Sequence, residues 1–305
     1  MKSSNPWPKK PRPRPLPKSI DAKTLKEARQ EARAKLLAEG MPEDIAGLEA
    51  DLLLACALGK NRTYLLAHPE RLIQPLQVAR LESFVVRRQA KEPMAYILGE
   101  KEFFGLPLAV GPGALIPRPE TEHLVEAVLE ALPPHFSGAI ADLGTGSGAV
   151  ALALAKAHPK ACVVGVDLSW EALSWARENQ KRLGIAHVRW VRGLWAEALQ
   201  GFDLIAANPP YLAQDDPHLS DLAFEPRGAL VSGKTGLEAF SAIASCAWRA
   251  LLPQGMLVLE HGIGQEKAVQ DILQNAGFSG IEEKPDLSGI PRITKATKAF
   301  GKDKR

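Results

Sequence analysis

Residues 139–148 read AIADLGTGSG, and this stretch decides the fold of the larger part of the chain. Four of its first five residues are apolar, as in a buried strand, and three glycines alternate with Thr145 and Ser147 directly afterwards. The amphipathic run that follows, to about residue 157, predicts a helix. A strand, a glycine-rich turn and a helix in this order indicate an α/β domain in which the backbone can approach a bound molecule.

Downstream of this turn, short apolar runs alternate with helical patterns. The runs predicted to be strands are 162–166, 187–191, 202–206 and 256–260. The predicted helices are 169–183, 237–251 and 265–276. Strands that are separated by helices favour a doubly wound, Rossmann-like parallel sheet. Two further extended segments are expected near Ile281 and Ile293.

A separate helical domain is predicted before the sheet domain. Thr24 and Glu27 have the spacing of a capping box, and apolar residues recur at helical intervals from there to Gly40. Further helical patterns run from Pro42 to Gly59 and from 76 to 88, and a shorter period over 96–110 predicts a β-hairpin. The expected division is a Pro/basic tail at 1–19, a helical domain at 20–92, a hairpin connector at 93–115 and the sheet domain at 116–305.

Charge and composition exclude several classes of protein. The chain has 305 residues and a net charge of +3, but its first 18 residues hold six of the 38 Lys and Arg and no Asp or Glu. The other 287 residues therefore carry 32 basic and 35 acidic side chains, which argues against a folded part that wraps a nucleic acid. The tail also holds six of the 24 prolines, so we expect it to be disordered.

The compartment follows from what the sequence lacks. Three cysteines that are far apart, without a CxxC pair, favour neither disulfides nor a zinc site, and no other residues have the spacing of metal ligands. No secretion signal and no run of 18 apolar residues is visible. We therefore expect a cytoplasmic protein with no metal, no membrane association and a monomeric state.

The glycine turn predicts a nucleoside-containing cofactor. Its glycines follow the pattern G-x-G-x-G behind Asp142, whereas dinucleotide-binding turns read G-x-G-x-x-G. Asp167, which follows the second strand of the domain, could accept both hydroxyl groups of a ribose. Together these features favour S-adenosylmethionine over NAD.

The motif NPPY at 208–211 follows the strand 202–206, at the sheet edge where open α/β domains bind ligands. Two prolines make the corner rigid, so that the side-chain oxygen of Asn208 and the carbonyl oxygen of Pro209 could point the same way. Two convergent acceptors suit a planar NH₂ group, and Tyr211 could lie against its flat amide or base. The motif therefore predicts a methyl transfer to an amide or exocyclic nitrogen.

Five stretches together resemble the release-factor glutamine methyltransferases, the HemK-type enzymes. They are 95–105 (AYILGEKEFFG), 116–122 (IPRPETE), the glycine turn, 208–211 (NPPY) and 224–230 (FEPRGAL). The resemblance covers residues 24 to about 298. It implies transfer of a methyl group from S-adenosylmethionine, leaving S-adenosylhomocysteine, to the glutamine of the Gly-Gly-Gln loop in class I peptide release factors. It also implies that the helical domain helps to hold the release factor.

The resemblance assigns roles to individual residues. The cofactor-binding residues that it implies are Asp142, Gly144, Thr145, Gly146, Ser147, Gly148, Asp167, Trp195 and Asn208. The catalytic residues that it implies are Asn208, Pro209 and Tyr211, and the substrate-binding residues are Asn208, Pro209, Pro210 and Tyr211. Phe104 is offered as a wall of the substrate channel, although aromatic residues in a hairpin more often belong to the core.

The sequence departs from the family pattern at two positions. Leu194 stands before Trp195 where the family often has an acidic residue, so the contact to adenine is expected to be weaker or made by backbone. Ala207 stands where serine is common. Residues 119–121 favour a release-factor substrate over the ribosomal-protein glutamine that a related enzyme methylates.

Other functions share parts of this pattern. An adenine-N6 DNA methyltransferase would present the same two N–H bonds to Asn208 and Pro209, but it must also extract a base and read its neighbours. A guanine-modifying RNA methyltransferase could use the basic tail, and a scaffold that only binds the cofactor is supported by Leu194 alone. No stable nucleic-acid binding is expected.

Overall fold

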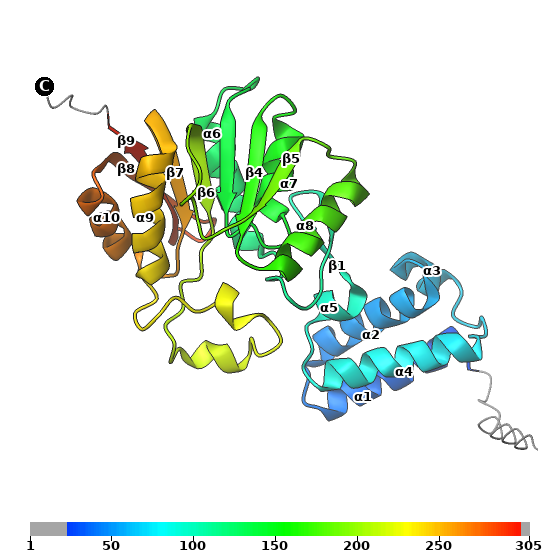
Figure 1. Cartoon of the computed structure of the whole chain (residues 1–305). Coiled ribbons are helices and arrows are strands. Elements are labelled where there is room, and N and C mark those ends of the chain that lie inside the picture. The colour runs from blue at the N-terminus through cyan, green and yellow to red at the C-terminus, as the bar shows by residue number, and fades with distance from the viewer. Residues whose placement is uncertain (1–22, 300–305) are drawn as a thin grey trace, which may run out of the picture. The chain divides into compact units, whose positions relative to one another are not determined.

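The computed structural model describes residues 23–299. These residues fall into two compact units, which divide between Ile97 and Leu98 (Figure 1). The predicted tail at 1–19 lies outside the described residues. Within residues 23–299, no helix is long and apolar enough to cross a lipid bilayer.

The first unit consists of helices. They are α1 (Leu25–Ala38), α2 (Glu43–Leu58), α3 (Arg62–Ala67), α4 (Pro75–Gln89) and α5 (Met94–Leu98). The capping box predicted at Thr24 is confirmed. The Thr24 side chain accepts a hydrogen bond from the Glu27 amide, and the Glu27 carboxylate accepts one from the Thr24 amide. Helix α3 was not predicted, although Asn61 caps it by accepting a hydrogen bond from the Tyr64 amide at 2.9 Å.

The connector is shorter than predicted, because residues 96–98 belong to helix α5 and not to the hairpin. The amides of Tyr96 and Ile97 both bond to the Pro93 carbonyl, and both side chains are buried, which holds this turn helical. The hairpin itself consists of β1 (Glu100–Phe103) and β2 (Leu106–Ala109). Its two turn residues, Phe104 and Gly105, have φ of +49° and +71°, as a type I′ turn requires.

The second unit is built around a seven-stranded sheet. Its strands are β3 (Ala139–Leu143), β4 (Cys162–Asp167), β5 (Val188–Arg192), β6 (Phe202–Ala207), β7 (Leu251–Glu260), β8 (Phe278–Pro285) and β9 (Pro291–Lys298). They lie in the order β5-β4-β3-β6-β7-β9-β8, and β3 to β7 pair in parallel. The doubly wound arrangement that the sequence predicted is confirmed for these five strands.

The two last strands make the sheet mixed and not wholly parallel. β8 and β9 are joined by a tight turn, and such a short connection can only join antiparallel neighbours. β9 also pairs antiparallel with β7 and so lies between β7 and β8. Strand β7 begins at Leu251, five residues before the predicted start, and pairs there with Phe202 of β6.

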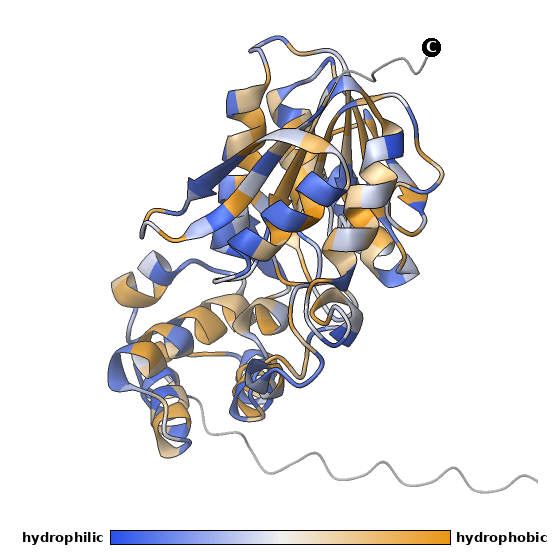
Figure 2. Ribbon diagram, turned by 90° about the vertical axis from the view of Figure 1, so that its left-hand side faces the viewer, coloured by the Kyte–Doolittle hydropathy of each residue, from blue (hydrophilic) through white to orange (hydrophobic). Residues whose placement is uncertain are grey.

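Helices cover both faces of the sheet. They are α6 (Glu122–Ala131), α7 (Ala149–Ala157), α8 (Trp170–Leu183), α9 (Glu238–Ala250) and α10 (Glu266–Asn275), with 3₁₀ turns η1 (Pro119–Thr121), η2 (Pro217–Ser220) and η3 (Arg227–Ala229). One buried apolar cluster joins α6 and α7 to the sheet and the β1–β2 hairpin, and a second joins α9 and α10. Figure 2 shows the apolar strands inside and polar positions on the outer helix faces. The parallel strands therefore place all their carboxyl ends at one edge.

Candidate functional site

A cavity of about 590 Å³ lies at the carboxyl edge of the parallel strands. Its walls come from the glycine turn after β3, the end of β4, residues 193–195 after β5, and the corner after β6. Residues 113–115, the loop at 226–232 and the first two turns of α9 complete the lining. A volume of this size matches small-molecule and cofactor sites, and this edge is where open α/β sheets bind their ligands.

The glycine turn is tied to the next strand by Asp167. One carboxylate oxygen of Asp167 accepts the Gly146 amide at 2.9 Å, and the other accepts the Ser169 amide at 2.9 Å. Burial raises the pKa of Asp167, although hydrogen bonds from Ser169, Gly146 and Leu168 oppose the shift. Each carboxylate oxygen can accept more than one hydrogen bond, so Asp167 can still receive hydroxyl groups from within the cavity.

Asp142 stabilises the turn from behind. Its side chain is buried and accepts hydrogen bonds from the Thr145 hydroxyl at 2.5 Å and from the Ala151 amide at 3.1 Å. Burial raises the pKa of Asp142 to about 6, with Thr145 and Ala151 opposing the shift. Asp142 therefore shapes the turn and does not itself line the cavity.

Apolar side chains form the outer part of the cavity. Leu168 and Leu194 line it and are 59% and 44% exposed, so they offer a flat ligand an apolar surface at the mouth. Trp195 lines it too, and its backbone has a φ of +49°, which is uncommon for a bulky residue. This turn brings the Trp195 ring close to the glycine turn. A Cβ atom added to Gly144 would lie only 3.5 Å from the Trp195 ring.

The corner after β6 presents Asn208 to the cavity. Its Nδ2 donates to the Thr121 hydroxyl at 2.8 Å, and Thr121 is buried in η1. The nitrogen and the oxygen of an amide diverge from the same carbon atom. A bond from the nitrogen to Thr121 therefore turns the side-chain oxygen of Asn208 away from Thr121. The oxygen is then the part of the amide that can accept a hydrogen bond from a bound molecule.

The remaining residues of the NPPY motif differ in position. Pro210 lines the cavity, whereas Pro209 is buried in the corner. The Tyr211 ring packs on the second apolar cluster and against Gly262, and its carbonyl accepts a hydrogen bond from Gln265 at 3.0 Å. Burial raises the pKa of Tyr211, and the charge of Glu260 adds to the shift. The phenol is therefore neutral and held in place.

The structure brings some of the expected cofactor-binding residues together and places others behind them. The residues that line the cavity are Gly144, Gly146, Asp167, Trp195 and Asn208. Those in the same turn that do not line it are Asp142, Thr145, Ser147 and Gly148. Phe104 packs against the first apolar cluster from the hairpin turn, with its amide bonded to Glu122 at 3.0 Å.

Sequence reasoning missed part of the lining. Leu168, Ser232 and Glu238 line the cavity, yet none of them lies in a motif that the sequence analysis assigned to cofactor or substrate. The one sequence feature that could have pointed to Glu238 is its place at the start of α9. There its carboxylate accepts hydrogen bonds from the amides of Lys234 and Leu237. Burial opposes these bonds, but together they lower the pKa of Glu238 to about 2.

The segment at 116–118 is held by Glu225. This buried carboxylate accepts the Ile116 amide at 2.9 Å and forms an ion pair with Arg118. The stretches 116–122 and 224–230, which the sequence singled out separately, therefore contact each other beside the cavity. Arg118 does not line the cavity.

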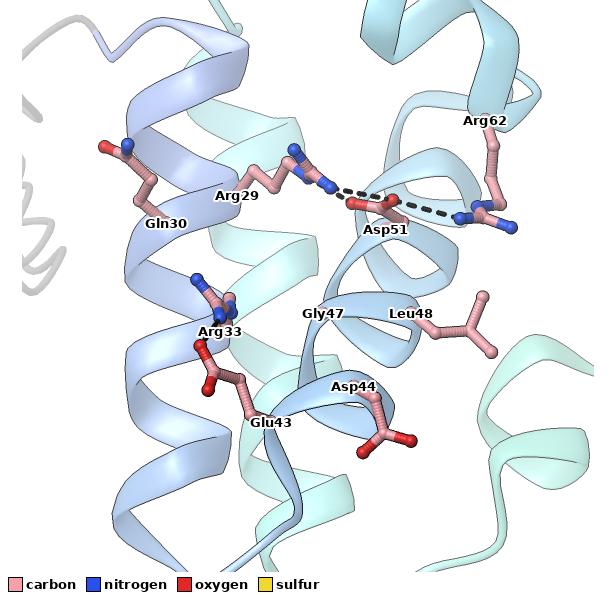
Figure 3. A pocket seen from close by; sticks show the side chains of 9 residues that line it. All are labelled: Arg29, Gln30, Arg33, Glu43, Asp44, Gly47, Leu48, Asp51 and Arg62. Atoms are coloured by element: carbon pink, nitrogen blue, oxygen red, sulfur yellow. Dashed lines mark hydrogen bonds and ion pairs between the residues drawn. The ribbon is translucent and has the colours of Figure 1, made fainter.

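A second cavity, of about 710 Å³, lies within the helical unit (Figure 3). Arg29 and Arg62 point from different helices toward the carboxylate of Asp51, which is buried, and Arg33 pairs with Glu43. Each of these guanidinium groups thus has an acidic partner within the unit, with Arg29 and Arg62 sharing one carboxylate. The cavity is thus lined mainly by paired charges.

Comparison with known proteins identifies both units. A protein-family model described as the PrmC N-terminal domain matches residues 27–99, and a second family model, described as the methyltransferase small domain, matches residues 121–223. A release factor glutamine methyltransferase of Vibrio cholerae is 44% identical over 276 residues, which are 89% of this chain and 96% of that protein. One from Bordetella pertussis is 45% identical over 265 residues, 85% and 96% of the two chains.

A solved structure supports the fold. The crystal structure of a methyltransferase from Pyrococcus furiosus aligns with a TM-score of 0.50 at 19% identity. The alignment covers 72% of this chain and 98% of that chain. At this identity the likeness concerns the fold alone.

Proposed function

The chain belongs to the release factor glutamine methyltransferase family, and from this premise we propose that its cavity holds S-adenosylmethionine beside Asn208. The enzyme is a methyltransferase that depends on this cofactor and modifies a glutamine of a release factor. The cofactor supplies a methyl group on a positively charged sulfur, which a nucleophile can displace. What this chain contributes is the binding, orientation and polarisation of the two reactants.

The cavity lining fits the parts of the cofactor. Asp167 supplies a carboxylate for ribose hydroxyls, and Gly144 and Gly146 leave room for a close approach to the backbone. Leu168, Leu194 and Trp195 offer apolar contact to the flat adenine, without the acidic residue that the family often has before the tryptophan. We propose that these residues hold the cofactor and that Asp142 and Thr145 fix the turn behind them.

Asn208 and Pro209 are proposed to hold the substrate amide. Two acceptors at a rigid corner can each take one N–H of a glutamine side chain and so fix the direction of its nitrogen. Tyr211 is proposed to limit the space on one side of the amide, and Phe104 to contribute to the approach of the substrate. The observation that carries this proposal is the hydrogen bond from Asn208 to Thr121, because it leaves the amide oxygen free to accept.

The reaction is a displacement at carbon. When bound, the cofactor would supply the methyl carbon to the amide nitrogen, and the bond from that carbon to sulfur would break with its electron pair going to sulfur. An amide nitrogen is a poor nucleophile because its lone pair is delocalised, so acceptors that draw its hydrogens out of plane favour the transition state. The methylated nitrogen is strongly acidic and loses one proton to water, so no dedicated base is required.

The substrate is proposed to be the glutamine of the Gly-Gly-Gln loop in a class I release factor, with the helical unit holding another part of that protein. The negative balance of residues 19–305 supports a protein substrate over a nucleic acid. We further propose that the enzyme is a monomer and acts in the cytoplasm, where release factors work.

Label transfer tests this function. Purified release factor, a variant with its loop glutamine changed to alanine, a ribosomal protein mixture and duplex DNA are each incubated with the enzyme and with radiolabelled S-adenosylmethionine. Label is expected on the unmodified release factor alone. Label on DNA, or equal label on the alanine variant, would overturn the assignment, and label on a ribosomal protein would favour the related glutamine methyltransferases.

A further inference from the structure

Three side chains form a hydrogen-bonded row from the interior of the sheet domain to the cavity. Glu260 is the last residue of β7, and Asn208 directly follows β6. Ala207 and Leu259 are register partners in these neighbouring strands, so the next residues, Asn208 and Glu260, lie beside each other at the carboxyl ends of the two strands. Thr121 lies between them: its hydroxyl oxygen accepts Nδ2 of Asn208 at 2.8 Å, and its side chain is the hydrogen-bonding group that lowers the pKa of the Glu260 carboxyl against the effect of burial.

The row is shielded from water at its inner end. Glu260 and Thr121 are 3% and 5% exposed, and the second carboxylate oxygen of Glu260 has no hydrogen-bond partner among the described residues. Leaving such an oxygen unpartnered is costly, so a buried glutamate at this place calls for an explanation. A strand end that needed only to pack would be served better by an apolar residue.

The chemistry of the groups fixes the direction of each hydrogen bond. When Glu260 is ionised, its carboxylate only accepts, so the single hydroxyl hydrogen of Thr121 must point to it. Only lone pairs of the Thr121 oxygen then face Asn208, and only the NH₂ end of the Asn208 amide can bond to them. The reversed amide would set its oxygen against those lone pairs.

We propose that Thr121 and Glu260 are positioning residues that hold the Asn208 amide with its oxygen directed to the substrate. This inference rests on the proposed role of Asn208 as an acceptor for the substrate amide. A reversed Asn208 would present N–H groups to the N–H groups of the glutamine, and that arrangement repels the substrate nitrogen. Thr121 and Glu260 therefore set the polarity of the site without themselves touching cofactor or substrate.

The test compares two substitutions at Thr121. Thr121→Val keeps the shape but removes the hydroxyl, and Thr121→Ser keeps the hydroxyl. We expect Thr121→Val to lower kcat about tenfold, the effect of one hydrogen bond, with the dissociation constant of S-adenosylmethionine unchanged. Thr121→Ser should restore most of the lost turnover. Equal activity of the valine and serine variants, whether high or low, would overturn the proposal.

Thr294 provides a matched control. It is also a buried threonine whose hydroxyl donates to a glutamate, Glu283, at 2.8 Å, but this pair has no bond to Asn208. Thr294→Val should lose stability as Thr121→Val does and keep its kcat. A similar fall in kcat in both variants would show a general loss of packing and contradict a positioning role.

Asn208→Ala separates this inference from the proposed function. If Asn208→Ala keeps its kcat, the function proposed for Asn208 fails, and the inference fails with it. If Asn208→Ala loses turnover while Thr121→Val does not, only the positioning role is wrong. In the double variant Thr121→Val/Asn208→Ala, we expect no loss beyond that of Asn208→Ala alone, because Thr121 acts through Asn208.

Discussion

Nδ2 of Asn208 lies 2.8 Å from the hydroxyl oxygen of Thr121, a residue 87 positions earlier in the chain. Asn208 follows a strand of the sheet, and Thr121 ends the 3₁₀ turn before helix α6. The bond between them links the NPPY corner to the stretch 116–122. These two motifs therefore form one site, and the orientation of the Asn208 amide depends on both.

Asn208→Ala should reduce turnover strongly and leave cofactor affinity nearly unchanged. The substitution removes an acceptor that is placed for the transition state, and losses of about 10²–10³ in kcat are typical for such groups. Radiolabel transfer at saturating substrates gives kcat, and calorimetry gives the dissociation constant for S-adenosylmethionine. Asn275→Ala, at an exposed position on α10, is the control. Collapsed cofactor binding with normal turnover at saturation would contradict the assignment.

Asp167→Ala should weaken cofactor binding by about 10–100-fold, the range expected when hydrogen bonds to a charged group are lost. Turnover at saturating cofactor should change much less. The control is Asp203→Ala, because the Asp203 carboxylate also accepts a backbone amide, that of Ala139 at 2.8 Å, but at the opposite end of strand β3. If both variants bind the cofactor as the unaltered protein does, Asp167 does not contact it.

Gly146→Ala and Gly148→Ala should separate binding from stability. Both glycines have positive φ, +56° and +84°, so alanine costs about 1 kcal/mol or more at either position. A Cβ on Gly148 would lie 2.8 Å from the Trp190 ring, whereas one on Gly146 meets nothing within 4 Å. Gly148→Ala should therefore lose a further ~1–3 kcal/mol of unfolding free energy in urea titrations.

Gly146→Ala should instead weaken cofactor binding, because its methyl group enters space at the edge of the cavity. Calorimetry with S-adenosylmethionine compares the two variants. A Gly146→Ala variant that binds as tightly as the unaltered enzyme would show that the cofactor does not pack against this turn.

Asp142→Asn should change how stability depends on pH. The pKa of Asp142 is raised from 3.8 to about 6 in the folded chain, so between these values the folded state binds more protons than the unfolded state. Its contribution to stability is therefore largest at low pH and is lost as pH rises to about 6, by roughly 3 kcal/mol. Urea titrations from pH 4.5 to 7.5 should show a smaller decline for Asp142→Asn. Parallel curves for the two proteins would contradict this account.

Turnover should rise with pH through about 7. Burial raises the pKa of Glu260 to about 7, Thr121 opposes the shift, and the charges of Glu120, Arg292 and His261 also act on this carboxyl. Below that pH Glu260 gains a proton and can donate to Thr121, so the Asn208 amide is no longer held in one orientation. A pH profile of kcat at saturating substrates measures this effect.

Glu260→Gln removes the titrating group while keeping its size. Its kcat should be lower than that of the unaltered enzyme at pH 8 and should not vary through pH 7. Thr121→Val should also give a flat profile, because the link to Asn208 is cut. A step at pH 7 that persists in both variants must come from another group, such as His261.

The sequence predicted the parts of the site that depend on local order along the chain. The run 139–148 fixes a strand and a glycine turn, and NPPY follows a strand, so both had to reach the same edge of a parallel sheet. That reasoning needs only the alternation of strands and helices. For the same reason, strands β3 to β7 were expected in the right places, although β7 begins earlier than predicted.

What the sequence did not predict depends on contacts between distant segments. Nothing near Glu260 distinguishes it from an exposed charge at a strand end, and its partner Thr121 lies in another motif. The antiparallel β8 and β9 were recognised as extended segments, but their order in the sheet is decided by a tight turn and by pairing with β7. Helix α5 is decided by the burial of Tyr96 and Ile97, which a short-period pattern could not reveal.

The position of β9 determines when the sheet can be completed during synthesis. β9 is made after β7 and β8, yet it lies between them in the sheet, and the carbonyl oxygen of its residue Arg292 accepts a hydrogen bond from the His261 amide next to Glu260. Until residues 291–298 have emerged from the ribosome, β7 has an unpaired edge that other chains could join. A chain cut short before this point would therefore be prone to aggregation, and the His261 amide beside Glu260 would lack its partner.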